Sequence, residues 1–460
     1  MKLLNKKKKA SLIIVGAVAV ALACLVAVRW NVWFGIPDEP PYAATGNPCR
    51  IMLTLGDSTE LSRNVSWQCG DEVREAWLEL KQDEDSVALR VEAVGEVYVS
   101  RSGKAAYYYA KLRNLEHGRT YQYRVATDGK FSPWHEFSTM KEGEELSFMY
   151  LGDVQDTIGG RANAYLRQAL SRNRDAQLLM CGGDLVERPA DVWWQEAFDD
   201  LDSVRQSMPV MCIAGNHDYM KTLPDSTERR FSLVFSYFLD SHLDESLVNT
   251  FSIANAQFFL LDSNASPKGL WMQRVWLSER LAESKAKWKI VLLHHPLYSI
   301  CGSMNNLMQR SVFDDLLRDN NVDLVLQGHE HAYARMTAEE DEKTAPVYVV
   351  SHCSPKNYRI EFDDRYDKYG ISSRYYQMVR THGDTLSYAA YDAPSHSLYD
   401  SLLVVKRANK KPKVVDLGRS ILECMTFNGD MNKSRDKDFY NRIMEYCSKH
   451  PERISRQKSR

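Results

Sequence analysis

Gln177-Leu-Leu-Met-Cys-Gly-Gly-Asp184-Leu-Val-Glu187 is the stretch that decides the fold of this chain. An apolar run meets two glycines, which predicts a buried strand followed by a turn that presents the carboxylate of Asp184. Uninterrupted apolar runs are typical of strands covered on both faces, as in a parallel sheet. Four other stretches share the design: Leu146–Asp153 ends in Gly-Asp, Val210–Asp218 in Gly-Asn-His-Asp, Lys289–His295 in His-His, and Val322–His331 in Gly-His-Glu-His.

The polar residues at the ends of these strands predict a metal site. Open α/β sheets place functional side chains at the carboxyl ends of their strands, so we expect one sheet edge to collect them. The set comprises Asp153, Gln155, Asp184, Asn216, His217, His294, His329 and His331. In a short extended turn, the i, i+2 spacing of His329 and His331 can direct the two rings to two neighbouring ions. Asp184 is suited to bridge such ions, because a carboxylate can give one or both oxygens.

Length and composition are those of a globular protein. The 460 residues leave room for two or three domains. The formal net charge of −2 provides no broad basic field, so we expect no nucleic-acid partner.

The N-terminal segment predicts export. Lysines precede Ser11–Val28, an uncharged stretch of roughly 18 residues that is marginally long enough to span a membrane. The lysines should stay in the cytoplasm, which places the rest in the periplasm or outside the cell. We favour an uncleaved anchor, because Trp30 and Trp33 suit an interfacial belt. Cleavage as a signal peptide, with secretion, is the alternative, and lipidation at Cys24 is a third option.

The pattern along the chain divides it into six segments. Residues 1–10 form a cytoplasmic basic segment, 11–30 the anchor or signal, 31–46 a linker, 47–140 an all-β sandwich, 141–405 an α/β domain and 406–460 a charged extension. Short alternating strands with turn signals between them predict the sandwich, and strands alternating with helical segments predict βαβ units. The expected helices cover residues 161–172, 191–206, 273–284, 309–320 and 436–449.

Eight of the nine cysteines lie beyond the N-terminal segment, where export would permit disulfides. Two pairs are close enough in sequence to bond, Cys49 with Cys69 and Cys424 with Cys447, although sequence alone does not give the connectivity. Cys181 and Cys212 lie in strand-like runs and are expected to be buried free thiols.

Four motifs together resemble the calcineurin-like metallophosphoesterase superfamily, and within it the purple acid phosphatase branch. They are Gly183-Asp184, Gly215-Asn216-His217-Asp218, Val291-Leu-Leu-His294 and Gly328-His-Glu-His-Ala-Tyr-Ala-Arg335. The resemblance covers roughly residues 47–405. It implies a four-layer α/β/β/α sandwich with two β-sheets face to face, preceded by a fibronectin type III-like domain.

The resemblance also implies a dinuclear metal centre with assigned ligands. Asp153 and His331 would bind the first ion, and Asp184 would bridge to the second. The ligands of the second ion would be Asn216, His294 and His329. Gln155 is similar to an amide variant found in some manganese-dependent members and is expected to be a further ligand. His217 would protonate the leaving group.

Two departures from the branch affect the expected chemistry. The purple enzymes carry a tyrosinate ligand three residues after the bridging aspartate, where this chain has Glu187. We therefore expect a colourless protein with two divalent ions (Mn, Fe, Zn or Mg). Glu187 could coordinate a metal, but a position at the surface or behind the ligands is favoured. Plant-type members also have a substrate-side histidine after the position of His294, and Cys301–Leu307 has none. Arg310 is the cation nearest to that loop in sequence.

Three further features each allow two interpretations. His295 either faces the substrate or is packed and hydrogen-bonded, with equal weight. His352, after a strand, could line the pocket, although a packed position is favoured. Trp193-Trp194 is expected to pack a helix rather than to stack on a base.

The function predicted from these residues is that of an exported, membrane-anchored phosphoesterase. It would hydrolyse phosphomonoesters of small molecules through a dinuclear metal centre and a bridging hydroxide. Phosphodiester hydrolysis on the same core is the enzymatic alternative. The non-enzymatic alternative is a surface interaction protein with a vestigial metal core.

Overall fold

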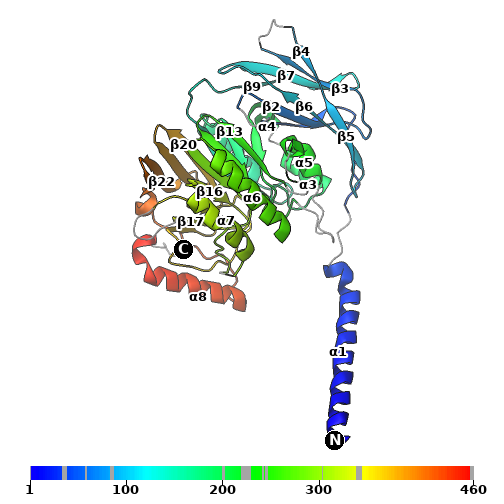
Figure 1. Ribbon diagram of the computed structural model, residues 1–460, viewed down its shortest axis with the longest axis vertical. Helices are drawn as coiled ribbons and strands as arrows, with labels where there is room; N and C mark the ends of the chain where they lie inside the picture. The colour runs from blue at the N-terminus through cyan, green and yellow to red at the C-terminus, as the bar shows by residue number, and fades with distance from the viewer. Residues whose placement is uncertain are drawn as a thin grey trace.

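The computed structural model describes residues 2–33, 39–56, 60–82, 87–198, 202–218, 229–240, 243, 247–302, 304–337 and 344–455. Figure 1 shows three parts: a long N-terminal helix, a β-domain and a larger α/β domain. The helix, α1 (Lys2–Trp33), projects away from the folded domains. Among the described residues, no helix is both long and apolar enough to cross a membrane. Export of the catalytic domain stays a prediction.

The β-domain consists of two antiparallel sheets packed face to face. The first has the order β1-β2-β6-β5 and the second β4-β3-β7-β8, with β9 paired to β7. Their bounds are β1 (Cys49–Leu55), β2 (Arg63–Gln68), β3 (Ala76–Lys81), β4 (Leu89–Glu92), β5 (Val94–Val99), β6 (Lys104–Leu112), β7 (Thr120–Thr127), β8 (Lys130–Phe131) and β9 (His135–Ser138). Strict alternation of buried and half-buried residues along β3 shows why the sequence forms a sandwich, because every second side chain faces the other sheet. Trp67 and Tyr108 stack in its core with ring centroids 5.7 Å apart.

The α/β domain contains two seven-stranded mixed sheets. The first has the order β12-β11-β10-β20-β21-β22-β23 and the second β13-β14-β15-β16-β18-β17-β19. The strands of the first sheet are β10 (Ser147–Leu151), β11 (Leu178–Cys181), β12 (Val210–Cys212), β20 (Tyr375–His382), β21 (Thr385–Asp392), β22 (Leu398–Arg407) and β23 (Lys410–Asp416). Those of the second are β13 (Asn249–Ile253), β14 (Ala256–Leu260), β15 (Trp288–Leu292), β16 (Leu324–Gln327), β17 (Tyr333–Thr337), β18 (Val347–Val350) and β19 (Lys368–Gly370).

The five apolar runs form β10, β11 and β12 of the first sheet, with β12 at its edge, and β15 and β16 in the interior of the second. β10, β11 and β12 pair in parallel, as do β14, β15, β16 and β18. The two sheets face each other across a shared core, in which the rings of Phe148 and Phe258 meet edge to face at 5.2 Å. Parallel strands of one sheet end at the same edge, so the polar residues that follow them gather there.

Helices cover the outer face of each sheet, which confirms the predicted α/β/β/α sandwich. The helices of the α/β domain are α2 (Ala162–Arg172), α3 (Asp191–Phe198), α4 (Asp202–Ser207), α5 (Arg229–Val234), α6 (Pro267–Glu283), α7 (Leu307–Asp319) and α8 (Ser434–Lys449). Of these, α4 contacts β1 and β9 of the β-domain, and α5 contacts β2 and β6. Short 3₁₀ turns occupy Ser236–Asp240, Gly418–Ser420 and Pro451–Arg453. Leu277 of α6 and Phe313 of α7 are completely buried in the core on the outer face of the second sheet.

Several elements differ in detail from the sequence predictions. Within the helix expected over residues 191–206, the structure describes α3 and α4, and residues 199–201 lie outside the described residues. α6 begins at Pro267, six residues before the predicted start, because the side chain of Ser266 accepts a hydrogen bond from Gly269 N and caps it. The first sheet continues past residue 405 into β23, and Ile443 of α8 is buried in the core of the second sheet.

All nine cysteines are free thiols, so neither candidate disulfide is formed. Cys49 lies opposite Gln68 across β1 and β2, not opposite Cys69, and its thiol donates to Gln68 O. Cys181 and Cys212 are buried in neighbouring strands, as predicted.

Buried polar contacts join the β-domain to the α/β domain. Arg50 of β1 pairs with Asp191 at the start of α3 at 2.9 Å, and both side chains are buried. Ser102 Oγ donates to the second oxygen of Asp191 at 2.7 Å, and Arg230 of α5 approaches the same oxygen at 3.3 Å. Ser66 Oγ of β2 donates to Val234 O at 2.5 Å.

Candidate metal centre

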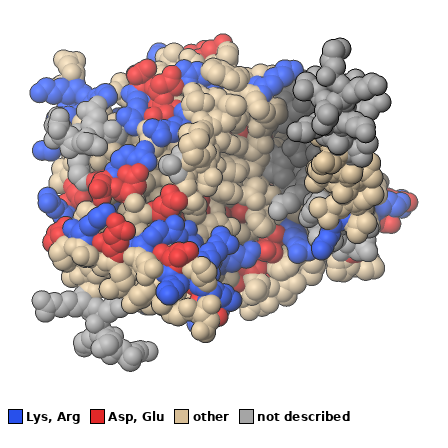
Figure 2. Space-filling model, turned by 90° about the horizontal axis from the view of Figure 1, so that it is seen from below, with Lys and Arg blue, Asp and Glu red and all other residues tan. Residues whose placement is uncertain are grey.

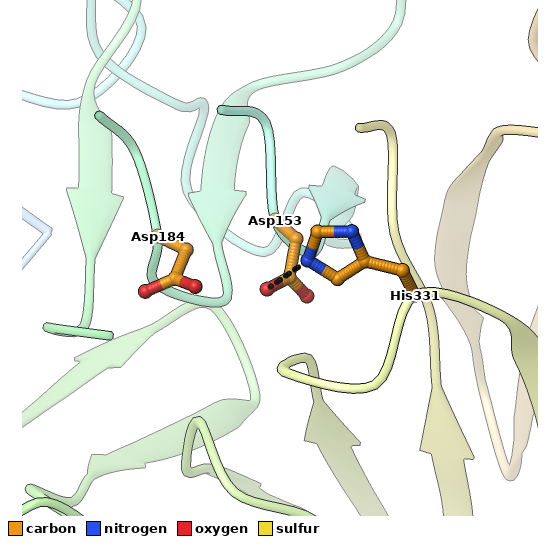
Figure 3. Close-up of side chains that lie close together, drawn as sticks. All are labelled: Asp153, Asp184 and His331. Atoms are coloured by element: carbon orange, nitrogen blue, oxygen red, sulfur yellow. Dashed lines mark ion pairs between the residues drawn. The ribbon is translucent and has the colours of Figure 1, made fainter. Parts of the chain in front are cut away.

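Asp153, Asp184 and His331 converge at the edge where the parallel strands end (Figure 3). Asp153 follows β10, Asp184 follows β11, and His331 lies between β16 and β17. Their ligand atoms all lie within 4.8 Å of one another, and all three residues are buried. His331 Nε2 is 3.6 Å from Asp153 Oδ1, which Figure 3 marks with a dashed line. Two carboxylates and an imidazole at this separation form a donor set for a divalent cation.

A second group of donors adjoins the first and shares Asp184 with it. Asn216 Oδ1 lies 2.8 Å from His329 Nδ1 and 3.2 Å from His294 Nε2. His294 Nε2 is also 3.4 Å from Asp184 Oδ1. Nδ1 of His294 donates to Gly182 O at 2.8 Å, which leaves Nε2 as the nitrogen that can bind a metal. The two donor groups therefore have the arrangement expected of two ions bridged by Asp184.

The loops that carry these residues have unusual backbone conformations. Asp153, Asp184 and His329 have φ angles of 40°, 51° and 70°. L-residues adopt this left-handed region at a cost and mainly where the surroundings enforce it. Two short hydrogen bonds do so here: His329 N donates to Asp153 Oδ2 at 2.6 Å, and His217 N donates to Asp184 Oδ1 at 2.8 Å.

Glycines precede the donors because the loops approach one another too closely for a side chain. A Cβ at Gly215 would lie 2.2 Å from both the amide nitrogen and Oδ1 of Asp184. A Cβ at Gly328 would lie 2.5 Å from Asp153 Oδ2. The Gly-Asn-His-Asp and Gly-His-Glu-His motifs are thus requirements of packing around the two carboxylates.

Three buried polar atoms near His331 show that the first donor group fits a metal ion. Asp153 Oδ1, Gln155 Oε1 and His331 Nδ1 are buried without a hydrogen-bond partner. Gln155 Nε2 lies 3.2 Å from His331 Nε2, so the amide of Gln155 is next to the histidine nitrogen that also faces Asp153. Buried polar atoms without partners are costly, and a bound cation would satisfy the oxygens.

The electrostatics of the site also favour a cation. Burial lowers the pKa of His294, but the carboxylate of Asp184 outweighs burial and raises the pKa above its usual value. Burial lowers the pKa of His329 to about 3 and that of His331 to about 4, so both rings are neutral at physiological pH. Neutral imidazoles offer lone pairs, and the carboxylates supply negative charge that needs compensation.

His217 and Glu187 lie at the rim of the site. His217 is half-buried and its Nδ1 lies 2.8 Å from the backbone carbonyl of Glu187, so Nδ1 donates there and Nε2 is the free nitrogen. The side chain of Glu187 pairs with Lys356, whose Nζ is 2.6 Å from each carboxylate oxygen. Lys356 belongs to the loop after β18, and no motif in the sequence points to it.

His295, His352 and Trp194 all pack against neighbouring side chains in the folded protein. Nδ1 of His295 forms a hydrogen bond with Ser263 Oγ at 2.9 Å. The centroid of the His295 ring lies 4.3 Å from that of His329. His352 is completely buried and stacks on His331 at 5.5 Å. Trp194 is completely buried against Phe198 and Phe231, which is the helix packing expected of it.

Comparison with known families agrees with this geometry. Residues 146–333 match the calcineurin-like phosphoesterase family, and residues 48–139 match the N-terminal domain of purple acid phosphatases. The chain is thus a metallophosphoesterase, a hydrolase of phosphoric ester bonds, and this family implies a dinuclear metal centre.

Individual relatives define the branch. Purple acid phosphatase 5 of Arabidopsis thaliana is 21% identical over 341 residues, which cover 68% of this chain and 80% of that protein. Purple acid phosphatase 4 of the same plant is 26% identical over 287 residues, covering 55% and 82%. The solved structure of a purple acid phosphatase from yellow lupin (Lupinus luteus) seeds superposes with a TM-score of 0.69 at 16% identity, covering 79% of this chain and 75% of that one. The chain is therefore a purple acid phosphatase-like metallophosphoesterase with the N-terminal domain of that branch.

Proposed function

We propose that this chain hydrolyses phosphomonoesters with two divalent metal ions held by Asp153, Gln155, Asp184, Asn216, His294, His329 and His331. The observation that carries the proposal is the pair of adjacent donor groups that share Asp184. Asp153 and His331 lie on one side of Asp184, with Gln155 beside them. Asn216, His294 and His329 lie on the other side.

The chain's own residues supply orientation and a proton. When bound, the two metal ions would polarise the phosphoryl group and lower the pKa of a water molecule so that it can attack phosphorus. His217 would give a proton from Nε2 to the departing oxygen, because its Nδ1–H is held by Glu187 O. The bond from His217 N to Asp184 Oδ1 fixes the position of this ring relative to the bridging carboxylate.

The substrate class follows from the relatives, because phosphatases of this family act on phosphorylated small molecules. On the face that Figure 2 shows, positive and negative side chains are interspersed over the described residues.

The test is the hydrolysis of two chromogenic esters by the full chain. p-Nitrophenyl phosphate and bis-p-nitrophenyl phosphate would be assayed with Mn, Zn, Fe or Mg added in turn. We expect turnover of the monoester by a colourless protein, falling by about a hundredfold or more in Asn216→Ala, because that variant removes the oxygen between two ligand histidines. Asn432→Ala, at an exposed position in the turn before α8, is the matched control.

Either of two results would contradict the proposal. Preference for the diester would make the chain a phosphodiesterase on the same core. Metal-loaded protein without turnover of either ester would remove these ester classes as substrates.

We also propose that the catalytic domain works outside the cytoplasm. The support is the lysine-rich start followed by the uncharged stretch Ser11–Val28. Protease added to cells whose outer envelope has been opened, with the cytoplasmic membrane intact, is expected to degrade the catalytic domain while a cytoplasmic marker protein stays whole. A domain that is degraded only after the cytoplasmic membrane is broken would contradict export.

A further inference from the structure

An ion pair between Glu187 and Lys356 joins two loops next to the candidate metal centre. Lys356 Nζ lies 2.6 Å from both carboxylate oxygens of Glu187. The side chain of Glu187 is 23% exposed and that of Lys356 is 43% exposed. Ion pairs with this degree of exposure contribute little net stability, so the ammonium can change partners at low cost.

Backbone and ring contacts connect each member of this pair to a residue of the centre. Glu187 lies three residues after Asp184, and its carbonyl accepts a hydrogen bond from His217. Lys356 lies two residues before Tyr358, whose amide donates to His331 O at 3.1 Å. The ring of Tyr358 stacks on that of His331 at 4.3 Å and an angle of 2°. The ion pair thus joins the loop that holds His217 to the loop that contacts His331.

The loop that carries Lys356 lies against the first donor group, because Tyr358 contacts both the backbone and the ring of His331. The other cation that the sequence suggested, Arg310, lies over the ring of Tyr298 at 4.1 Å. Lys356 is therefore the better placed of the two for a ligand at the metal centre.

A phosphomonoester needs a positive group at this position more than a diester does. The monoester dianion has three non-bridging oxygens, whereas the diester has two and carries a single charge. Two metal ions can each take one oxygen, which leaves the third oxygen of the monoester directed away from them. A mobile ammonium at the rim can meet that oxygen as a point charge.

We propose that Lys356 is the phosphate-binding residue that selects monoesters, and that Glu187 holds its ammonium in place until substrate arrives. This inference rests on the proposed function. In the free protein the ammonium pairs with Glu187, and in the complex it pairs with the third phosphate oxygen. Glu187 is then a competitor of the substrate for the same cation.

Two variants of Lys356 test the proposal on the metal-loaded full chain. Binding of inorganic phosphate would be measured by calorimetry, together with kcat and KM for both p-nitrophenyl esters. We expect Lys356→Met to weaken phosphate binding and raise the monoester KM by about 10- to 100-fold, since it removes a charge-assisted contact. The diester KM should change by less than about threefold. Lys356→Arg should restore most of the phosphate affinity, and Lys437→Met, on the exposed face of α8, should behave as the original protein.

Glu187→Gln separates this role from a structural one. Removal of the competing carboxylate should leave Lys356 free and tighten phosphate binding by several-fold. If Glu187→Gln weakens binding as much as Lys356→Met does, the pair only supports the loops and the inference is wrong. Unchanged phosphate affinity in Lys356→Met, or equal losses for monoester and diester, would also overturn it. Failure of the proposed function is a distinct result, because the calorimetry reports phosphate binding even without turnover.

Discussion

Asp184→Asn is expected to lower monoester turnover by about a thousandfold or more, equivalent to ~4 kcal/mol of transition-state stabilisation. Asp184 belongs to both donor groups, with Oδ1 3.4 Å from His294 Nε2 and its ligand atom within 4.8 Å of those of Asp153 and His331. An amide in its place keeps the size of the side chain but removes its negative charge and one of its two metal-binding oxygens. Elemental analysis should find fewer than two metal ions per chain.

Asp319→Asn provides the matched control for this prediction, because Asp319 is an exposed residue at the end of α7. It should retain full turnover and full metal content. An Asp184→Asn protein that kept both metal ions and near-normal turnover would show that Asp184 does not bridge, and the assignment of the two ions would have to be abandoned.

Arg335→Met is expected to destabilise the catalytic domain by about 3–5 kcal/mol. Arg335 of β17 is completely buried and binds Asp400 of β22 through Nε at 2.7 Å and Nη2 at 3.2 Å. It also reaches Asp416 of β23 at 3.0 Å. These contacts join the second sheet to the first. Methionine fills a similar volume but leaves the buried Asp400 charge without its main partner. The measurement is the shift of the urea midpoint, followed by circular dichroism.

Arg335→Met has a matched control at Arg365 and a compensating second substitution at Asp400. Arg365→Met breaks a half-exposed pair with Asp363 and should cost about 0–1 kcal/mol. Adding Asp400→Asn to Arg335→Met should recover part of the loss, because it removes the uncompensated charge. Equal midpoints for Arg335→Met and Arg365→Met would contradict the role assigned to the buried cluster.

The donors of the metal centre were predictable from sequence because each one directly follows a strand. Asp153, Asp184 and His294 end apolar runs, and parallel pairing brings the ends of neighbouring strands to one edge of each sheet. Asp153 and Asp184 follow strands of the first sheet and His294 follows a strand of the second, so the packing of the two sheets then brings the two edges together. The sandwich was predictable for a similar reason, since its strands alternate with period two. Both signals are local in the chain, and neither depends on contacts between distant residues.

Elements positioned by distant contacts could not be predicted in this way. Lys356 reaches the site through its pairing with Glu187, 169 residues earlier in the chain. β5 is one such element, because Gly95 interrupts the alternating pattern that marks a strand in the sequence. A Cβ at Gly95 would lie 2.8 Å from the ring of Tyr108, so the glycine is required by a neighbour on another strand. β23 has the basic composition of a solvated segment, yet Pro412 and Val414 alternate inward as in an edge strand.

The buried position of Asp191 has a consequence for the architecture of this enzyme. Asp191 lies seven residues after Asp184, in the segment that also carries Glu187, and two of its partners, Arg50 and Ser102, come from the β-domain. The β-domain therefore supports the segment that carries Glu187 and Asp191, and we expect the catalytic domain to depend on it. Without the β-domain, the carboxylate of Asp191 would lose its contacts with Arg50 and Ser102 and would be exposed to solvent. That change would fall in the same segment as Glu187, close to the metal centre.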